Sequence, residues 1–269
     1  MSTTLRVPRR VRHELKFRTL TVASVEDLGP TMRRIVLEGE DLGGFVSLGF
    51  DDHVKLFPVA PGQALTLPTL GPDGPVFPEP RPVARDYTPR AFDAANRRLT
   101  IDFVTGHGGP ATEWAEGATP GAVVGVGGPR GSFIVPSAFA DHVLIGDETA
   151  LPAIARRLEE LPVGVRALAI VEVDDAASRL PLASDAALTV VWVERNGRPR
   201  ARSEGLETAM DAALASVDRA DAYVWIAAES AVAKTLRAKA LSMGFSPRAM
   251  KAAGYWRQGA VGAHEVIED

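Results

Sequence analysis

Short apolar runs separated by turn residues fill the first half of the chain. The runs are rich in Val, Ile, Leu, Phe and Thr, and Gly, Pro or Asp interrupts them, as is typical of β-strands. Several short strands with glycine turns predict a small antiparallel β-barrel. The expected strands are Lys16–Ala23, Thr31–Glu38, His53–Pro58, Leu99–Val104 and Val123–Val126.

The segment from Pro58 to Pro89 interrupts this pattern. Nine of the 20 prolines of the chain lie in it. Because proline lacks the backbone N–H that helices and central strands need, such a density excludes both structures. We therefore expect a long irregular loop that leads into Arg85.

From about residue 140 onward, buried strands alternate with helical segments. This alternation predicts a parallel sheet covered by helices, with a domain boundary near Pro136–Asp141. The expected strands are His142–Ile145, Arg166–Val173, Leu188–Glu194 and Ala222–Ala228, and the expected helices are Ala150–Glu160, Ser203–Ser216 and Ala231–Met243. The chain should therefore consist of a basic N-terminal arm (1–16), a β-barrel domain (17–138) and an α/β domain with a C-terminal extension (139–269).

Composition narrows the function. The chain has 269 residues, 46% of them hydrophobic and 24% charged, as in a globular protein of two domains. Its net charge of −4 argues against nucleic acid as the main partner. The absence of cysteine excludes disulfides, Cys-ligated iron–sulfur clusters and thiolate zinc sites. If the protein transfers electrons, an organic cofactor must carry them.

The N-terminus carries many basic residues. Arg9-Arg10 could imitate a twin-arginine signal, but no apolar core follows it. No stretch approaches the roughly 20 apolar residues of a membrane span. We expect the residues from Arg6 to Arg18 to form a solvated lead-in to the first strand, and the protein to be cytoplasmic.

The hexapeptide Arg-Asp-Tyr-Thr-Pro-Arg at 85–90 combines a cation, an aromatic ring and a hydroxyl. A guanidinium binds phosphate through two parallel hydrogen bonds, and a tyrosine ring offers a face for stacking. A flavin nucleotide requires all three groups. On a strand Arg85 and Tyr87 share one face, whereas Thr88 faces the other way unless the strand ends there. An ordinary strand end before a proline turn is the alternative.

A glycine-rich segment, Thr105-Gly-His-Gly-Gly-Pro110, follows an expected strand. Pro110 suits the first position of a helix, and the backbone N–H groups of Ala111 and Thr112 would point outward at its positive end. This arrangement is an anion site suited to a pyrophosphate. A glycine loop before a surface helix is the alternative.

A second strand-to-helix junction lies at Gly146-Asp-Glu-Thr-Ala-Leu-Pro-Ala. It lacks the later glycines of the dinucleotide fingerprint. By local chemistry alone it is a helix cap, in which Asp147 or Thr149 accepts from the first-turn amides.

The remaining polar candidates are isolated. His53 and His107 have no partner at ligand spacing, so we expect no metal site. Three cations lie next to expected β segments: Lys55, Arg130 and Arg257. Taken one at a time, each fits an ordinary surface charge. The segment Gly254-Tyr-Trp-Arg-Gln-Gly fits a core strand as well as a ring-stacking role. Four arginines after the third α/β strand fit either a 2′-phosphate or a solvated loop; they are Arg195, Arg198, Arg200 and Arg202.

Taken together and in this order, the segments resemble the siderophore-interacting proteins. These are flavin-dependent ferric-siderophore reductases of the wider ferredoxin-reductase-like group. Arg85-x-Tyr87-Thr88 marks only the broad flavin-reductase group, whereas the segments at 146–153 and 254–257 point to the siderophore branch. The other matching segments are Asp52-His-Val-Lys-Leu-Phe, Asp102-Phe-Val, Gly109-Pro-Ala-x-x-Trp114-Ala and Gly127-Gly-Pro-Arg-Gly-Ser. The spacing around His107 is tighter than the family pattern, and residues 60–82 form a long proline-rich stretch.

The resemblance implies an FAD-holding barrel followed by a Rossmann-like α/β domain that binds NADH or NADPH. Arg85 would clamp the pyrophosphate, Tyr87 would stack on the isoalloxazine, and Thr88 would hydrogen-bond near its redox-active nitrogen. Trp256 would shield the ring. The full set of implied cofactor-binding residues is Arg85, Tyr87, Thr88, Asp102, His107, Gly109, Pro110, Ala111, Thr112, Trp114, Asp147, Thr149, Ala150 and Trp256.

The implied activity is reduction of Fe(III) held in a siderophore, with electrons passing from NAD(P)H through FAD. Fe(II) is softer than Fe(III) and is held less tightly by oxygen ligands, so reduction releases it. No catalytic acid or nucleophile is expected. Ferric siderophores are often anionic, and Lys55, Arg130 and Arg257 are the expected basic contacts. The alternatives are a general NAD(P)H flavin or ferric-chelate reductase and a non-catalytic flavin or siderophore carrier. We expect a monomer.

Overall fold

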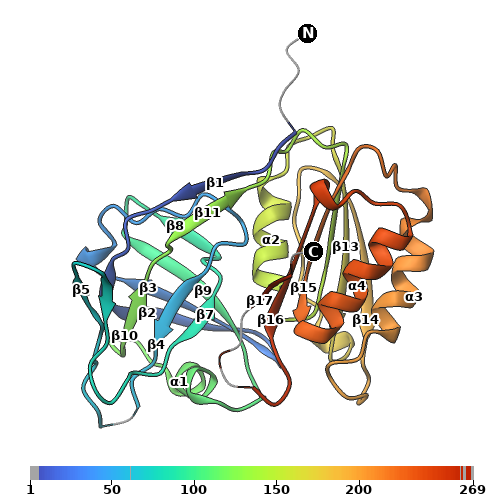
Figure 1. Ribbon diagram of the computed structural model, residues 1–269. Coiled ribbons are helices and arrows are strands. Elements are labelled where there is room, and N and C mark those ends of the chain that lie inside the picture. Colours follow the sequence, from blue (N-terminus) through green and yellow to red (C-terminus); the bar gives the residue numbers. More distant parts are fainter. Residues whose placement is uncertain (1–5, 61, 261, 263–264, 268–269) are drawn as a thin grey trace. The chain divides into compact units, whose positions relative to one another are not determined.

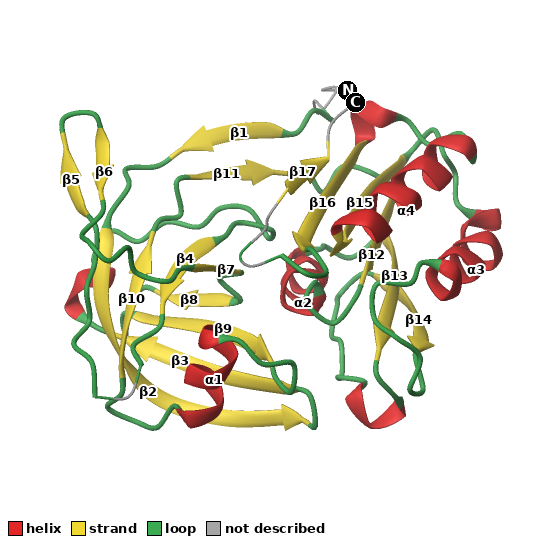
Figure 2. Ribbon diagram, turned by 60° about the horizontal axis from the view of Figure 1, so that its bottom comes forward, coloured by secondary structure: helices red, strands yellow, loops and turns green. Residues whose placement is uncertain are grey.

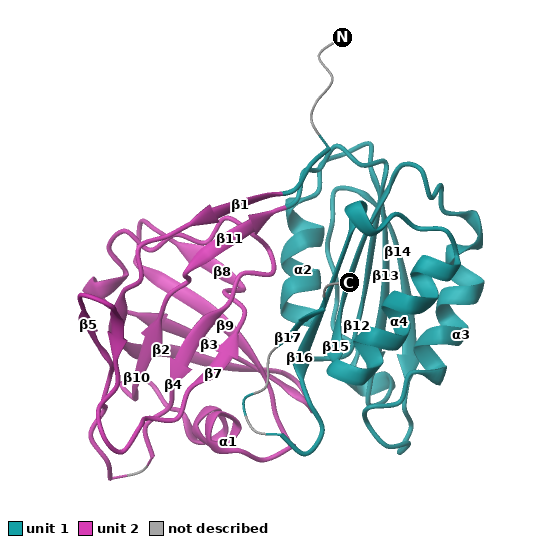
Figure 3. Ribbon diagram, viewed as in Figure 1, with its two compact units in different colours: residues 1–8, 135–269 teal, residues 9–134 magenta. Residues whose placement is uncertain are grey.

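The computed structural model describes residues 6–60, 62–260, 262 and 265–267. The chain divides into two compact units, each with its own sheet and core (Figures 1 and 3). We call residues 9–134 the β unit, and residues 135–269 together with 1–8 the α/β unit.

The β unit is built on a seven-stranded antiparallel sheet. Its strand order is β7-β4-β10-β2-β3-β9-β8, so β7 and β8 are the edges. The strands are β2 (Phe17–Gly29), β3 (Met32–Glu38), β4 (Val54–Phe57), β7 (Arg85–Tyr87), β8 (Ala91–Asp93), β9 (Arg98–Val104) and β10 (Val123–Gly127). Alternating side chains such as Ile35 and Leu37 of β3 are fully buried, and helix α1 (Pro110–Gly117) packs Ala111 and Ala115 into the same core. This confirms the antiparallel β architecture expected for the first half.

Two segments of the β unit differ from the sequence-based expectation. The proline-rich stretch is not irregular throughout, because it contains a hairpin of β5 (Thr69–Gly71) and β6 (Gly74–Val76). The basic N-terminus is exposed, as expected, but it is more than a lead-in, because β1 (Arg9–Arg12) pairs with β11 (Gly131–Ile134). Backbone hydrogen bonds form strands irrespective of side-chain charge, so a two-stranded ribbon can carry arginines.

Arg18 was also expected in the solvated lead-in and is instead buried in β2. Its Nη1 donates to the carbonyl of Gly128 at 2.7 Å and its Nε to that of Asp41 at 3.0 Å. Burial lowers the pKa of this guanidinium, while the nearby carboxylates of Asp41 and Glu14 act in the opposite direction.

The α/β unit contains a six-stranded sheet in the order β14-β13-β12-β15-β16-β17. The first five strands in this order are parallel, and β17 is antiparallel to β16. The strands are β12 (Asp141–Gly146), β13 (Arg166–Val173), β14 (Ala187–Glu194), β15 (Ala222–Glu229), β16 (Met250–Trp256) and β17 (Glu265–Ile267). This confirms the expected α/β class, and the segment ending at Trp256 completes a core strand.

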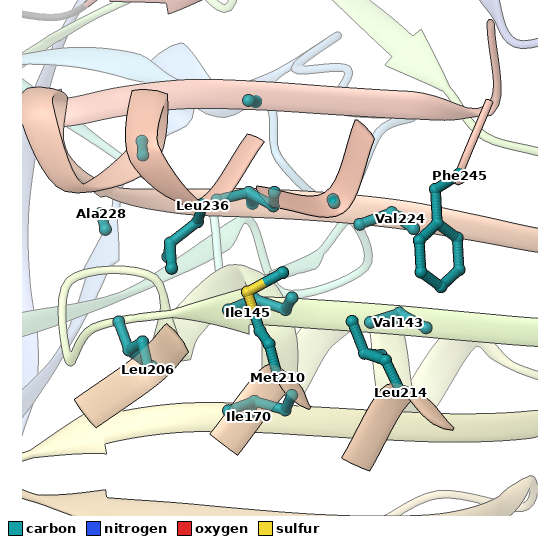
Figure 4. Packing of buried hydrophobic residues seen from close by; sticks show 14 of the residues in the cluster. Val143, Ile145, Ile170, Leu206, Met210, Leu214, Val224, Ala228, Leu236 and Phe245 are labelled. Atoms are coloured by element: carbon teal, nitrogen blue, oxygen red, sulfur yellow. The ribbon is translucent and has the colours of Figure 1, made fainter. Parts of the chain in front are cut away.

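Three helices cover this sheet. α2 lies on one face and α3 and α4 on the other (Figures 1 and 2). The helices are α2 (Leu151–Glu160), α3 (Glu204–Ala213) and α4 (Ser230–Ser242). Among the described residues, short 3₁₀ segments occupy Ala176–Ser178, Leu214–Ser216 and Pro247–Ala249 of this unit and Glu40–Leu42 of the β unit. Figure 4 shows Leu206 and Met210 of α3 facing Ile145 and Ile170 of the central strands, which makes one continuous core. Every residue of β12 is buried, as in a strand covered on both faces.

Within the described part of the chain, no helix is long and apolar enough to cross a membrane. The same residues contain no group of three or more His, Asp or Glu side chains placed to hold a metal ion.

Candidate functional site

The segment 85–88 lies on and just after the edge strand β7. Arg85 pairs with Leu56 of β4, and Tyr87 pairs with Val54. Because β7 ends at Tyr87, the buried Thr88 is released from strand alternation. Arg85 Nη1 donates to the carbonyl of Ala84 at 2.8 Å, and among the described residues no carboxylate pairs with this guanidinium. Arg85 therefore keeps donors for an anionic ligand.

Tyr87 links this strand to helix α1. Its ring centroid lies 4.4 Å from that of Phe103, which in turn lies 5.9 Å from Trp114. Burial raises the pKa of the Tyr87 phenol, while the Arg85 charge and a hydrogen bond with Thr112 act in the opposite direction. The phenol is therefore neutral at physiological pH, and the ring contacts through Phe103 to Trp114 place β7 beside α1.

The start of α1 has no side-chain cap. Its N-cap is Gly109, with φ of 103°, a conformation that disfavours any residue with a Cβ. Pro110 has no N–H and Glu113 N donates to the Gly109 carbonyl at 2.8 Å, which leaves the amides of Ala111 and Thr112 at the positive end of the helix. The structure thus contains the uncapped helix start that the glycine-rich segment predicts.

His107 is exposed and lies against this helix start. One ring nitrogen, Nδ1, is 3.0 Å from the carbonyl of Gly108, and the other, Nε2, is 3.2 Å from Thr112 Oγ1. Thr112 is buried in the first turn of α1, so the exposed His107 ring contacts the helix start from the solvent side. The tight glycine spacing therefore places His107 next to α1.

Asp102 has protein partners on both oxygens. Arg34 Nε donates to Oδ1 at 2.7 Å and Arg34 Nη2 to Oδ2 at 2.8 Å, while Arg90 Nε lies 3.8 Å from Oδ2. The sequence analysis did not select Arg34 or Arg90. Arg34 and Asp102 are register partners on β3 and β9, so pairing these two strands in the correct register would have found the ion pair.

A cavity of about 750 Å³ lies within the β unit. One wall is the outward face of α1, including Pro110, Glu113 and Trp114. The other walls are segments 57–66 and 79–83 of the proline-rich stretch, apart from residue 61, which lies outside the described residues. This volume is typical of small-molecule sites.

The strand-to-helix junction at Gly146 differs from the predicted cap. α2 begins at Leu151 with Ala150 as its N-cap, and no side chain caps it. Asp147 instead accepts from Thr149 N at 2.9 Å and Thr149 Oγ1 at 2.5 Å, which is a local turn before the helix. A Cβ on Gly146 would collide with the Ala227 carbonyl and Ala150 Cβ, so this glycine is required by close packing.

Asp147 binds two further donors from distant parts of the α/β unit. Oδ2 accepts from Glu229 N at 3.1 Å and from Trp256 Nε1 at 2.8 Å. Burial raises the pKa of Asp147, and its hydrogen bonds from Thr149 and Trp256 act in the opposite direction. The carboxylate joins the carboxyl ends of β12, β15 and β16, the edge where nucleotides bind in α/β sheets.

Glu148 and Arg195 form an ion pair that is buried on both sides. Arg195 donates to Glu148 at 2.6 and 3.0 Å, and each side chain is 3% exposed. Arg195 also lies 3.4 Å from both Glu172 and Asp174, and Arg200 lies 2.8 Å from Glu148. Arg195 is thus neither solvated nor available for a 2′-phosphate, because four carboxylate oxygens already surround it.

The other arginines of this loop are arranged differently. Arg198 donates to the carbonyls of Arg195 at 2.9 Å and Glu194 at 2.5 Å. Arg202 is exposed, and its only ion-pair contact among the described residues is Glu204 at 4.0 Å. Of the four, Arg202 alone fits the solvated alternative fully.

The three expected substrate contacts occupy different surroundings. Lys55 on β4 is opposite Gly127 of β10 and pairs with Asp86 at 2.7 Å. Arg130 is exposed three residues after Gly127, so the β unit brings these two cations to neighbouring backbone. Arg257 is exposed directly after β16 of the α/β unit.

Comparison with known families gives two matches that together span most of the chain. Residues 21–133 match the siderophore-interacting FAD-binding domain, and residues 139–259 match the siderophore-interacting protein domain. A protein of Escherichia coli (strain K12) named NADPH-dependent ferric-chelate reductase is 40% identical over 262 residues, which cover 95% of this chain and 99% of that protein.

Solved structures agree with these matches. A siderophore utilization protein from T. fusca is 37% identical, with a TM-score of 0.88 over 95% of this chain and 98% of that one. The ferredoxin reductase of carbazole 1,9a-dioxygenase in its FAD apo form is 14% identical, with a TM-score of 0.65 over 88% of this chain and 66% of that one, which relates the folds alone. With a family match in each half and a relative aligned along nearly its whole length, this chain belongs to the siderophore-interacting protein family.

Proposed function

We propose that this protein is an NAD(P)H-dependent, FAD-containing reductase that reduces Fe(III) held in a siderophore to Fe(II). The observation that carries the proposal is the chain of ring contacts that runs from Tyr87 of β7 through Phe103 to Trp114 of α1. It joins a strand with an arginine free of carboxylates to a helix start without a cap. A dinucleotide with a pyrophosphate and a flat ring suits this pair of elements.

The residues of the β unit fit FAD. Arg85 and the first-turn amides of α1 would hold the pyrophosphate, and Tyr87 and Thr88 would contact the flavin. The cavity beside Trp114 has room for a further part of the cofactor. When bound, FAD supplies the step from a two-electron donor to one-electron acceptors, with the balance NAD(P)H + 2 Fe(III) → NAD(P)⁺ + H⁺ + 2 Fe(II).

The chain itself has to bind, orient and exclude water. No acid or nucleophile is required, because the nicotinamide C–H bond breaks by hydride transfer and reduction of the ferric complex breaks no bond to carbon or phosphorus. Lys55, Arg130 and Arg257 would attract an anionic ferric complex to a chain whose net charge is −4. Asp147 and Trp256 of the α/β unit remain proposed cofactor contacts.

The E. coli relative is named for NADPH. In this chain the Arg200 side chain is 32% exposed and the Arg202 side chain is 67% exposed, and both follow β14. They support NADPH as the donor, since an arginine near a strand end can accommodate a 2′-phosphate. A monomer in the cytoplasm completes the proposal.

The test is an acceptor comparison with the purified holoprotein. A yellow protein that oxidises NADPH and yields trapped Fe(II) from a ferric siderophore, faster than it reduces added free flavin, supports the proposal. Faster reduction of free flavin, with ferric chelates reduced only through it, would establish the general flavin reductase instead. A yellow protein that oxidises no NADPH or NADH with any ferric chelate would establish a carrier.

A further inference from the structure

The N-terminal strand β1 places three arginines on the surface of the β unit. Arg9, Arg10 and Arg12 are all exposed. Alternation along the strand puts Arg10 and Arg12 on the same face, and the Arg10 guanidinium lies 5.8 Å from the ring centroid of Phe133. None of the segments that resemble the siderophore-interacting proteins includes this strand.

β1 is fixed to the turn that carries Arg130. Arg12 is paired with Gly131, and His13 N donates to the carbonyl of Arg130 at 3.0 Å. The ring of His13 then lies 2.7 Å from Ser132 Oγ, which donates to buried Asp52 at 2.5 Å. The strand is therefore held by backbone and side-chain bonds on both sides of Arg12.

The same turn is the neighbour of Lys55. Gly127 pairs with Lys55, and Gly128 N donates to the carbonyl of Lys16 at 3.0 Å. These directly bonded backbone segments carry six exposed cations, which we call the basic turn surface: Arg9, Arg10, Arg12, Lys16, Lys55 and Arg130.

The carboxylates of this surface already have partners. Glu14 pairs with Lys16 at 3.1 Å and Asp86 with Lys55 at 2.7 Å, while Asp52 accepts hydrogen bonds from Ser47, Gly49 and Ser132. Arg12 and Arg130 have no carboxylate partner among the described residues. The surface therefore carries an excess of positive charge on a protein that is negative overall.

We infer that Arg10 and Arg12 extend the chelate-binding surface of Lys55 and Arg130, and that this surface selects anionic ferric chelates over neutral ones. The inference rests on the proposed function for the identity of the ligand. Guanidinium groups donate to the oxygens of catecholate and carboxylate ligands, and a local positive field raises the encounter rate with an anion. The field falls with salt because the groups are exposed.

The experiment compares two ferric complexes of different charge, the anionic ferric tris-catecholate and a neutral ferric trihydroxamate. The double variant Arg10→Glu with Arg12→Glu should raise KM for the anionic complex about tenfold at low salt and much less for the neutral one. Raising the salt concentration should shrink the difference. Arg12→Lys should retain most of the preference. Arg97→Glu with Arg98→Glu, at two exposed positions paired with Glu40 and Glu38, makes the same charge change and is the matched control.

A direct binding measurement separates this inference from the proposed function. The gallium(III) tris-catecholate has the same charge and shape but is not reduced, and its affinity can be followed by fluorescence quenching. If the wild type binds it and the double variant binds about tenfold more weakly, the surface is supported even where no ferric complex is reduced. Equal KM changes for both complexes, or an unchanged gallium affinity, would overturn the inference.

Discussion

The indole Nε1 of Trp256 donates a 2.8 Å hydrogen bond to Oδ2 of Asp147, which lies 109 residues earlier in the chain. Other bonds secure the same segment, since Ser230 Oγ donates to the Trp256 carbonyl at 3.1 Å and Gln258 N donates to Glu229 at 3.2 Å. The two segments that most resemble the siderophore branch are therefore in direct contact. Both segments belong to one junction, at the carboxyl ends of β12, β15 and β16 of the α/β unit.

Loss of the hydrogen bond between Trp256 and Asp147 should lower the free energy of unfolding. Trp256→Phe keeps an aromatic ring but removes the donor to a buried carboxylate, and we expect unfolding to become easier by about 1 to 2 kcal/mol in chemical denaturation. Trp192→Phe is the control, because the Trp192 indole on edge strand β14 makes no hydrogen bond among the described residues. Equal losses in both variants would show that the bond to Asp147 contributes nothing specific.

Removing Arg195 from its buried ion pair with Glu148 should destabilise the protein far more than removing the exposed Arg202 nearby. Arg195→Ala leaves Glu148 with Arg200 alone and Glu172 without a cation, so we expect a loss of about 3 to 5 kcal/mol. Arg202→Ala, at an exposed position in the same loop, should change stability by less than about 0.5 kcal/mol. Comparable unfolding midpoints for the two variants would contradict the buried network.

Glu172 should make stability depend on pH in a defined direction. Burial raises its pKa from 4.5 to about 7, against the opposing charge of Arg195, with Asp147 adding to the rise. The folded protein therefore holds this proton more tightly than the unfolded chain. The contribution of this proton to the free energy of unfolding is complete below about pH 4.5 and is lost as the pH rises through about 7.

The measurement is the free energy of unfolding of wild type minus that of Glu172→Gln across this pH range. We expect the difference to fall by about 2 kcal/mol from pH 4.5 to pH 8, after allowance for screening. A difference that stays constant would mean that the side chain ionises normally in the folded state. Glu204→Gln, on the exposed first turn of α3, serves as the control and should show no such trend.

Arg85 should decide FAD affinity. Arg85→Ala removes a guanidinium with free donors, and we expect Kd for FAD to rise about 10- to 100-fold in titrations of the apoprotein. Arg85→Lys keeps the charge without the two parallel donors, so its Kd for FAD should lie between those of the wild type and Arg85→Ala. Arg98→Ala, paired with Glu38 on the surface of the same unit, should leave Kd unchanged. Identical affinities in wild type and Arg85→Ala would remove Arg85 from the cofactor site.

Local patterns predicted more of the fold than of the site. The helix limits around α2 and α4 and most strands follow from apolar periodicity, because each reflects burial within a few neighbouring residues. β1 was missed because its strand depends on backbone pairing with residues about 120 positions later, which no side-chain pattern of Arg9–Arg12 reveals. The hairpin β5–β6 was missed because the high density of proline around it predicted an irregular loop throughout the segment.

The sequence by itself determined the two architectures, the family and the residue types of a flavin site, since these are written in contiguous segments. Only the tertiary structure decided how polar groups are shared. It paired Arg34 with Asp102, Arg195 with Glu148 and Trp256 with Asp147. Such pairs arise where strand ends from distant segments converge and each buried charge must find a partner, so the sequence shows the partners but not the pairing.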